Sequence, residues 1–390
     1  MNVKFNHMKS GSPYKWLLLI SVSIKLSYFL TAWILDKSML LPLNITSDIH
    51  GFLSVFNKND AGWYLRIAEN GYPYIKDPDV LKGFVNGQLQ QNSWAFFPLF
   101  PFLIYVVSAL LAVSGPAAAF IVILLFSVVS YILFYECARL FLKDDGKAWY
   151  CTLLFIVFPF NYYYSMFYTE PLFLTFMLGA LLAISYKKLY WLLLLLPALV
   201  LCRPNGMVVA FFVFIFFLWQ YWKNISPATP LTTAAKEIII SSLWFVVVPL
   251  TLLGYGWYQY KITGDFFAFS TAQHGWDRHD MFPFLALFRK GDLQNQFNSI
   301  YVCIILFFAV IFCKKIPLPF QLLIWLTILL PLGRGSINGI PRYISILLPF
   351  YYITTKYLWQ YRFKYYFLGF LFLLQLGNLW FWLQCAPFSY

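Results

Sequence analysis

The sequence predicts an all-α protein that crosses a membrane many times. Of its 390 residues, 61% are hydrophobic and only 11% are charged, whereas a soluble globular domain carries roughly 25% charged residues. Apolar stretches recur from one end of the chain to the other, and many approach the roughly 20 residues that a helix needs to span the hydrocarbon core. They lack the alternating pattern of a membrane β-barrel, so we expect helices.

The apolar stretches mark the expected helices in chain order. The first runs from about Lys15 to Leu35 and is too long and too late for a cleaved signal peptide, so we expect a true span. Neither internal repeats nor low-complexity linkers are evident, which favours one membrane domain over residues 1–390. The stretches are 15–35, 94–113, 117–141, 148–160, 168–186, 189–201, 207–222, 238–260, 299–313, 316–332, 343–355 and 365–383.

The net charge of +13 resides largely in short basic clusters between these stretches, such as Lys187–Lys188 and Lys314–Lys315. Such clusters are typical of cytoplasmic loops that contact anionic membrane lipids, and we expect no nucleic-acid partner. If the clusters are cytoplasmic, the polar stretches share the opposite face, including two large extracytoplasmic loops at 36–93 and 261–298. The shorter polar stretches on that face are 161–170, 203–206 and 333–342.

One early apolar stretch must fail to cross, because otherwise the lysine pair at 187–188 falls on the wrong side. Pro98 and Pro101 interrupt the start of the 94–113 helix and favour an interfacial or re-entrant path there. The alternative places the charged loop at 143–147 outside. Either way we expect about eleven crossings.

The first large loop contains the segment NDAGWYLRIAENGYPY, residues 59–74. An unpaired charge is costly in hydrocarbon, so Asp60 is expected where water or a polar substrate meets the membrane face. A helix over 60–70 would place Tyr64 one turn from Asp60, and Trp63 with Ile67 on another face suited to a membrane surface. A short interfacial helix whose aromatic residues only anchor it explains the pattern equally well.

A second segment, FPFNYYYSMFYTE at 158–170, ends in Glu170 and is followed by Pro171. Taken alone, a carboxylate beside a proline at a helix start favours a capping role for Glu170. The tyrosines suit either an aromatic belt or a sugar-stacking surface; they are Tyr162, Tyr163, Tyr164 and Tyr168.

Three further breaks carry cations. Arg203 opens the RPNG sequence that interrupts an apolar stretch, and its guanidinium suits a lipid phosphate, although snorkelling to phospholipid heads is an alternative. GDFFAFSTAQHGWDR at 264–278 contains His274 and Arg278, which suit hydrogen bonding to a phosphate or sugar; the histidine and aspartate spacing matches no zinc signature, so we expect no metal. The glycine-rich GRGSINGIPRY at 333–343 adds Arg334 and Arg342.

A carboxylate, several arginines and aromatic rings at one membrane face favour transfer of a group from a lipid phosphate. Asp60 would deprotonate an acceptor hydroxyl while arginines neutralise the departing phosphate. No GxSxG, Walker, GxGxxG or HExxH motif points elsewhere. A transporter or flippase for a lipid-linked sugar is the main alternative, because broken helices and intramembrane charges also mark transport paths; a scaffold subunit of a membrane complex is another.

Six segments in this order resemble the PIG-V family, the mannosyltransferases that add the second mannose to glycosylphosphatidylinositol, and their prokaryotic relatives. The segments are residues 59–74, 158–170 and 264–278 quoted above, together with AFFPLFP (95–101), RPNG (203–206) and IPRY (340–343). The resemblance implies a GT-C membrane fold, a polyprenyl- or dolichyl-phosphate mannose donor, and inverting transfer without a nucleotide sugar. The aromatic residue that usually precedes the family's aspartate is Asn59 here.

The resemblance also implies roles at matching positions. Asp60 becomes the base and Glu170 a candidate second carboxylate. Donor phosphate contacts fall to Arg203, Arg278 and Arg342, and a sugar or acceptor contact to Trp276. The residues themselves add His274 as a phosphate contact and Trp63, Tyr64 and Asn205 as sugar or acceptor contacts.

The expected partners are a lipid-phosphate mannose donor, a glycolipid or glycan acceptor and membrane lipids, with no cofactor. The expected location is the cell inner membrane of a prokaryote, or the endoplasmic reticulum membrane of a eukaryote, with the site on the extracytoplasmic or lumenal face.

Overall fold

The computed structural model describes residues 12–38, 40, 43, 45–85, 88–226, 229–276, 281–288, 293–335 and 339–384, with the backbone alone for 85, 276 and 293–295. Helices account for nearly all regular structure in these ranges. They are α1 (Pro13–Lys37), α2 (Ile49–Ser54), α3 (Ala61–Asn70), α4 (Pro78–Leu81), α5 (Leu99–Leu111), α6 (Gly115–Leu142), α7 (Asp145–Ile156), α8 (Glu170–Ser185), α9 (Leu192–Cys202), α10 (Gly206–Asn224), α11 (Leu231–Ser242), α12 (Val247–Thr263), α13 (Ala268–Thr271), α14 (Pro283–Ala286), α15 (Leu293–Ile311), α16 (Leu318–Gly333), α17 (Ile340–Ile344), α18 (Leu348–Leu358) and α19 (Lys364–Leu383).

The remaining elements are short. Strands β1 (Phe84–Val85) and β2 (Gln88–Leu89) form an antiparallel pair in which Phe84 lies opposite Leu89. Turns of 3-10 helix lie at Ser93–Ala95, Asn161–Ser165, Leu189–Trp191, Leu243–Phe245, Ala272–Trp276 and Cys313–Lys315.

Every predicted apolar stretch contains helix, so the all-α membrane prediction is confirmed. The stretch at 238–260 falls within one helical run, Leu231–Thr263, in which a single 3-10 turn joins α11 to α12. Together with α1, α6, α10 and α19, this run is long and apolar enough to span a membrane. Five shorter apolar helices accompany them in the described ranges. The count of about eleven crossings stays a prediction.

The helix that follows Pro98 is short. With 13 residues, α5 extends roughly 20 Å, less than the roughly 30 Å of the hydrocarbon core. Its N-cap is Pro98, and Pro101 lies in its first turn, where a missing backbone N–H is tolerated. This length suits the interfacial or re-entrant path expected for the stretch.

The centre of the bundle is α6, which packs against α1, α5, α7 and α8. It starts at Gly115 and Pro116, and proline is favoured in the first turn of a helix. It ends where Lys143 adopts a left-handed conformation (φ 54°), which terminates the helix. Phe134 and Tyr131 bury their rings completely against neighbouring helices. The core therefore lies between helices that are themselves apolar on most faces.

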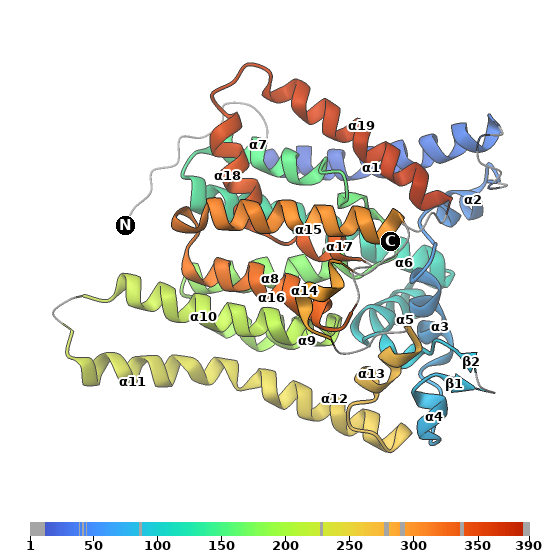
Figure 1. Ribbon diagram of the computed structural model, residues 1–390, viewed down its shortest axis with the longest axis horizontal. Coiled ribbons are helices and arrows are strands. Elements are labelled where there is room, and N and C mark those ends of the chain that lie inside the picture. The colour runs from blue at the N-terminus through green and yellow to red at the C-terminus, as the bar shows by residue number, and fades with distance from the viewer. Residues whose placement is uncertain are drawn as a thin grey trace.

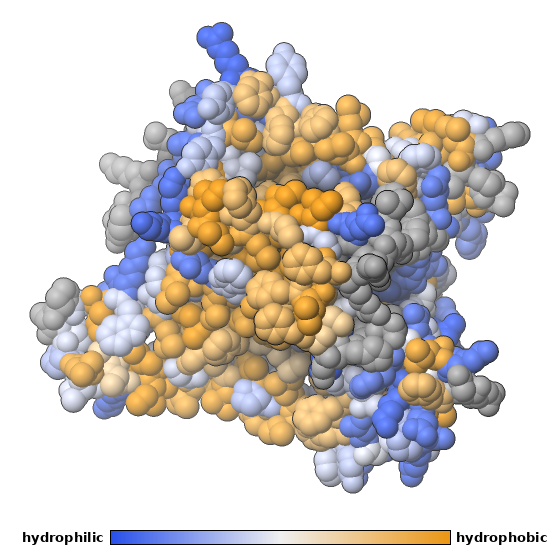
Figure 2. All heavy atoms as spheres, in the orientation of Figure 1, coloured by the Kyte–Doolittle hydropathy of each residue, from blue (hydrophilic) through white to orange (hydrophobic). Residues whose placement is uncertain are grey.

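The long helices run side by side, and the short elements α2, α3, α4, β1, β2 and α13 gather at one end of them (Figure 1). Figure 2 shows apolar residues over the middle of the molecule on this face, with hydrophilic residues at both ends. This distribution is that of a bundle embedded in a bilayer, with polar loops at the two water interfaces. Most of these short elements belong to the first large loop, which therefore lies against the ends of the long helices.

Candidate active site at the loop end of the helix bundle

The turn before α3 directs Asp60 toward the bundle. Asn59 has φ 56°, a left-handed conformation that asparagine tolerates better than most residues. Asp60 precedes the first residue of α3, yet its carboxylate makes no capping bond with that helix. Instead Oδ2 accepts a hydrogen bond from Nη1 of Arg342 at 2.9 Å. The carboxylate is thus available for contacts across the bundle.

The helix expected after Asp60 is present as α3, but its apolar face packs inside the protein. Ile67 is 5% exposed, and α3 lies against α5 and α6. Trp63 stacks on Phe96, with ring centroids 5.8 Å apart. The prediction of a membrane-facing surface is therefore wrong for Ile67, because α3 packs against the apolar hairpin of α5 and α6. Trp63 is half-buried and lines the cavity described below.

The tyrosine-rich segment at 158–170 lies in the protein core and not at the membrane interface. The rings of Tyr162, Tyr163, Tyr164 and Tyr168 are at most 2% exposed, which contradicts the aromatic-belt alternative. A backbone bond from the Phe167 amide to the Phe56 carbonyl, 3.1 Å, ties the segment to the first loop. Tyr168 lines the cavity described below, and the guanidinium carbon of Arg342 lies 4.4 Å from its ring centroid.

Glu170 begins α8 with its side chain only 1% exposed. Its Oε1 accepts a hydrogen bond from Nε of Arg342 at 2.8 Å, and Nη1 of Arg203 lies 3.3 Å from the same oxygen. Oε2 is buried without a hydrogen-bond partner in the described part of the chain. Position in the first turn still suits a negative charge, but capping does not account for a buried carboxylate between two guanidinium groups. Glu170 thus lies at the helix start as the capping interpretation expects, and it also pairs with two guanidinium groups that the sequence alone did not assign to it.

Arg203 lies in the break between α9 and α10, where its backbone is extended (φ −168°, ψ 161°). The break needs glycine at 206, because a Cβ there would lie 2.2 Å from the Leu199 carbonyl oxygen. The Arg203 guanidinium lies against the rings of Phe173 and Tyr343, with its central carbon 5.3 and 5.2 Å from the two centroids. Burial replaces snorkelling, since the Arg203 side chain is only 10% exposed.

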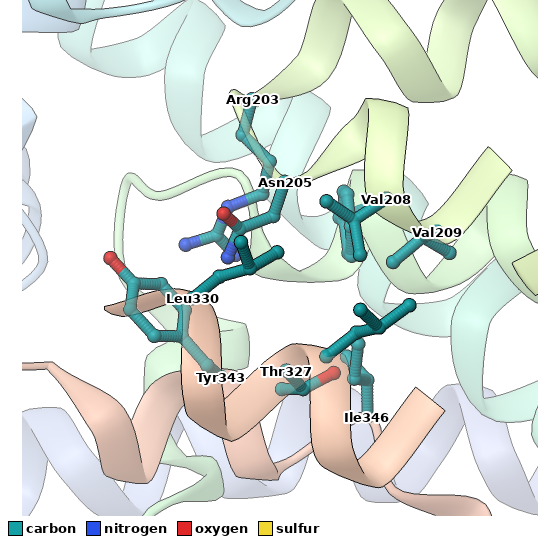
Figure 3. Close-up of a pocket in the computed structure, with 10 residues that line it drawn as sticks. Arg203, Asn205, Val208, Val209, Thr327, Leu330, Tyr343 and Ile346 are labelled. Carbon is teal, nitrogen blue, oxygen red and sulfur yellow. The ribbon is translucent and has the colours of Figure 1, made fainter. Parts of the chain in front are cut away.

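Figure 3 shows the Arg203 guanidinium and the Asn205 side chain pointing toward the ring of Tyr343 on α17. They lie at the mouth of a narrow crevice between α10 and α16. Its volume of about 10 Å³ is room for about one water molecule. The two helices are therefore closely packed beside the arginine.

Arg342 joins the two carboxylates. It lies in the short helix α17, which begins directly after Gly339. The φ of 76° at that position favours glycine. Burial acts to lower the pKa of Arg342, but the negative charges of Glu170 and Asp60 outweigh it and hold that pKa well above its ordinary value. The guanidinium therefore stays charged.

These residues border a cavity of about 700 Å³, a size typical of ligand pockets. It brings together residues from every polar stretch expected on one face, so their predicted convergence is confirmed. The predicted site residues that line it are Asp60, Trp63, Tyr64, Arg203, Asn205 and Arg342. Glu170 lies behind the wall.

Three predicted residues are not brought into this cavity by the described structure. His274 is exposed and absent from the lining, and its Nδ1 lies 2.9 Å from the carbonyl oxygen of Thr271. Arg278 and the neighbouring metal candidates Asp277, His279 and Asp280 lie outside the described residues, as does the side chain of Trp276.

The cavity also contains residues that sequence reasoning did not assign. Ser270 and Gln273 lie within the segment at 264–278, where the sequence prediction used the charged residues instead. Gln91 sits in the first loop with no motif around it, and Tyr343 follows Arg342 in a short helix. These are neutral hydrogen-bonding groups, the type that commonly contacts sugar hydroxyls, and only the tertiary fold marks them.

Arginines outnumber carboxylates among the charged side chains that line the described part of the cavity. Arg203, Arg334 and Arg342 are the cations there, and Asp60 is the anion. The buried Glu170 adds a second carboxylate behind the wall. An anion bound here would lie among guanidinium groups, beside a carboxylate able to accept a proton.

Comparison with known proteins identifies a family and a relative. The model of the family described as Mannosyltransferase (PIG-V) matches residues 14–285, which include Asp60, Glu170 and Arg203 and end before Arg342. The human protein named GPI alpha-1,6-mannosyltransferase 2 is 27% identical over 213 residues. That alignment covers 52% of this chain and 40% of the human protein.

Proposed function

The chain belongs to the PIG-V mannosyltransferase family, and from this premise we propose that it transfers mannose from a polyprenyl- or dolichyl-phosphate donor to a membrane-associated acceptor. The observation that carries the proposal is the cavity in which a hydrogen-bonded Asp60 lies among an excess of arginines. Family membership favours a transferase over the flippase alternative.

Asp60 is the proposed general base of an inverting transfer. The acceptor hydroxyl attacks the anomeric carbon from the side opposite the phosphate, and its proton passes to the carboxylate. A new carbon–oxygen bond forms, while the bond from that carbon to the phosphate oxygen breaks and its electron pair leaves with the phosphate. The Asp60 side chain is 33% exposed and lines the cavity, so a hydroxyl can reach it.

Arg203, Arg334 and Arg342 are the proposed phosphate contacts. The departing phosphate gains negative charge as the bond to the sugar breaks, and guanidinium groups fixed in advance stabilise that charge. Glu170 holds two of these groups in place from behind. The proposal includes no resident metal ion, because these cations can supply the neutralising charge.

The neutral groups that line the cavity are the proposed contacts for the acceptor. Gln91, Ser270 and Gln273 offer amide and hydroxyl groups, and Trp63 offers an aromatic ring, as glycan recognition requires. We place this site on the extracytoplasmic or lumenal face. A prokaryotic inner membrane is the favoured location, with a glycolipid or glycan as acceptor.

The test is transfer by purified protein in lipid nanodiscs. Polyprenyl-phosphate mannose carrying a labelled sugar is supplied with a membrane glycolipid extract, and GDP-mannose serves as the comparison donor. We expect label in the glycolipid fraction only from the lipid-phosphate donor. Asp60→Asn should lower the rate about 10²- to 10⁴-fold, the usual contribution of a general base.

Glu69→Gln is the matched control, because Glu69 lies on the same helix, is exposed and does not line the cavity. It should transfer at the wild-type rate. Undiminished transfer by Asp60→Asn would remove Asp60 as the base, and transfer from GDP-mannose alone would remove the lipid-phosphate donor. Mass spectrometry of the lipid-linked glycans that accumulate in cells lacking the protein would identify the acceptor.

A further inference from the structure

The guanidinium of Arg342 binds two carboxylates of very different exposure. Nε binds Glu170, whose side chain is 1% exposed, and Nη1 binds Asp60, whose side chain is 33% exposed. Breaking a buried ion pair leaves an uncompensated charge, whereas water stabilises the partners of a more exposed pair when they separate. The bond to Glu170 is therefore fixed, and the bond to Asp60 can be exchanged.

The same contact conflicts with the chemistry that both residues would perform. While Nη1 of Arg342 is hydrogen-bonded to Oδ2 of Asp60, that oxygen is shared with the cation and is less available to the hydroxyl of an acceptor. In turn, a guanidinium nitrogen engaged by a carboxylate cannot donate that hydrogen bond to a phosphate. Within the described residues, Arg342 is the side chain that hydrogen-bonds to Asp60.

We propose that Arg342 exchanges partners during the reaction, so that Nη1 pairs with Asp60 in the empty site and turns to the lipid phosphate once substrate binds. Nε stays on Glu170, which acts as the pivot. This inference rests on the proposed function, because it takes Asp60 as the base and a lipid phosphate as the leaving group. Arg342 then delays the base until the donor is in place.

The charge changes of the reaction then hold Arg342 on the phosphate after the exchange. Asp60 loses its negative charge when it takes the acceptor's proton. The phosphate, a diester with one negative charge in the donor, becomes a monoester with up to two after the sugar leaves. Both changes shift the attraction felt by Arg342 from Asp60 to the phosphate. When the lipid phosphate departs and Asp60 releases its proton, the ion pair forms again.

A double-mutant cycle on product binding tests the exchange. The probe is a short-chain prenyl phosphate without sugar, titrated calorimetrically into the full-length protein in detergent. The four proteins are wild type, Asp60→Asn, Arg342→Gln and the double variant. Asp60→Asn should bind about fivefold more tightly, because Arg342 no longer has to leave a partner. Arg342→Gln should bind more weakly, and the double variant should bind as weakly as Arg342→Gln.

The dependence on Arg342 separates exchange from a general field effect. Removing a negative charge near a phosphate favours binding by itself, but that effect would persist in the Arg342→Gln background. An equal gain in both backgrounds would overturn the proposal, as would no gain in Asp60→Asn. If Arg342→Gln does not fold, Arg342→Lys replaces it in the cycle, since lysine keeps the charge but cannot bind Glu170 and phosphate through separate nitrogens in the same way.

The transfer assay distinguishes failure of this inference from failure of the proposed function. Full transfer by Asp60→Asn would remove the base and leave the binding cycle readable. A lost coupling in the cycle, with transfer still dependent on Asp60, would overturn the exchange and leave the base in place. Glu69→Gln should bind the prenyl phosphate like wild type and controls for loss of a carboxylate elsewhere on α3.

Discussion

Nη1 of Arg342 lies 2.9 Å from Oδ2 of Asp60, while Nε of the same guanidinium lies 2.8 Å from Oε1 of Glu170. Two separate nitrogens of one planar group therefore bind two carboxylates carried by different elements. A planar fork with fixed donors can do this, and a single ammonium group cannot reproduce its geometry. The identity of the cation at this position is thus as important as its charge.

Arg342→Lys should fold but transfer slowly. Lysine keeps the positive charge beside Glu170 and loses one of the two directed contacts, so we expect a rate about 10²-fold lower, comparable to loss of one preorganised donor. Initial rates with the lipid-phosphate donor measure the effect. Arg362→Lys, at an exposed arginine beyond α18, is the control. A rate within twofold of wild type would mean that charge alone suffices.

Glu170→Gln should destabilise the protein as well as slow it. The substitution leaves the buried Arg203 and Arg342 without their shared counter-charge, so we expect the free energy of unfolding to fall by about 3 kcal/mol. Denaturant unfolding in detergent measures it. Glu237→Gln, at an exposed residue of α11, should change it by less than about 0.5 kcal/mol. Equal effects of the two substitutions would show that Glu170 does not hold the arginines.

Two glycine substitutions test the break that carries Arg203. Gly206→Ala would put a Cβ 2.2 Å from the Leu199 carbonyl oxygen and 2.8 Å from the Val200 Cα, so the turn must shift. We expect about 2 kcal/mol or more of lost stability together with weaker transfer. Gly254→Ala in α12 meets no atom within 4 Å and should be neutral or stabilising. Thermal unfolding and transfer rates compare the pair, and a neutral Gly206→Ala would contradict the steric argument.

We predict that the left-handed backbone conformation at position 59 determines which residues this position tolerates. Its φ of 56° costs a β-branched residue roughly 1–2 kcal/mol, whereas glycine adopts it freely. Asn59→Gly should therefore retain most transfer activity, and Asn59→Val should lower both stability and rate because Asp60 is displaced. Unfolding curves and initial rates decide the matter. Equal activity of the two variants would show that this conformation does not orient Asp60.

The helices could be predicted from sequence because hydropathy is a local signal, read within about 20 residues. Convergence of Asp60, Arg203 and Arg342 could also be predicted, since charge clusters assign all polar stretches to one face. The partners of Glu170 could not. Its neighbour Pro171 marks a true helix start and so suggests capping, while one of its partners, Arg342, is 172 positions away. Composition likewise cannot distinguish a tyrosine that faces lipid from one such as Tyr164 that is fully buried.

The separation of Asp60 from Arg342 by 282 positions has a consequence for biosynthesis. Chains are made and inserted from the N-terminus, so Asp60, Glu170 and Arg203 emerge from the ribosome well before the arginine that joins them. During that interval Glu170 has one cation where the finished protein provides two. A nascent chain released after α16 would hold most of its long helices, yet Asp60 and the buried Glu170 would lack the cation that joins them.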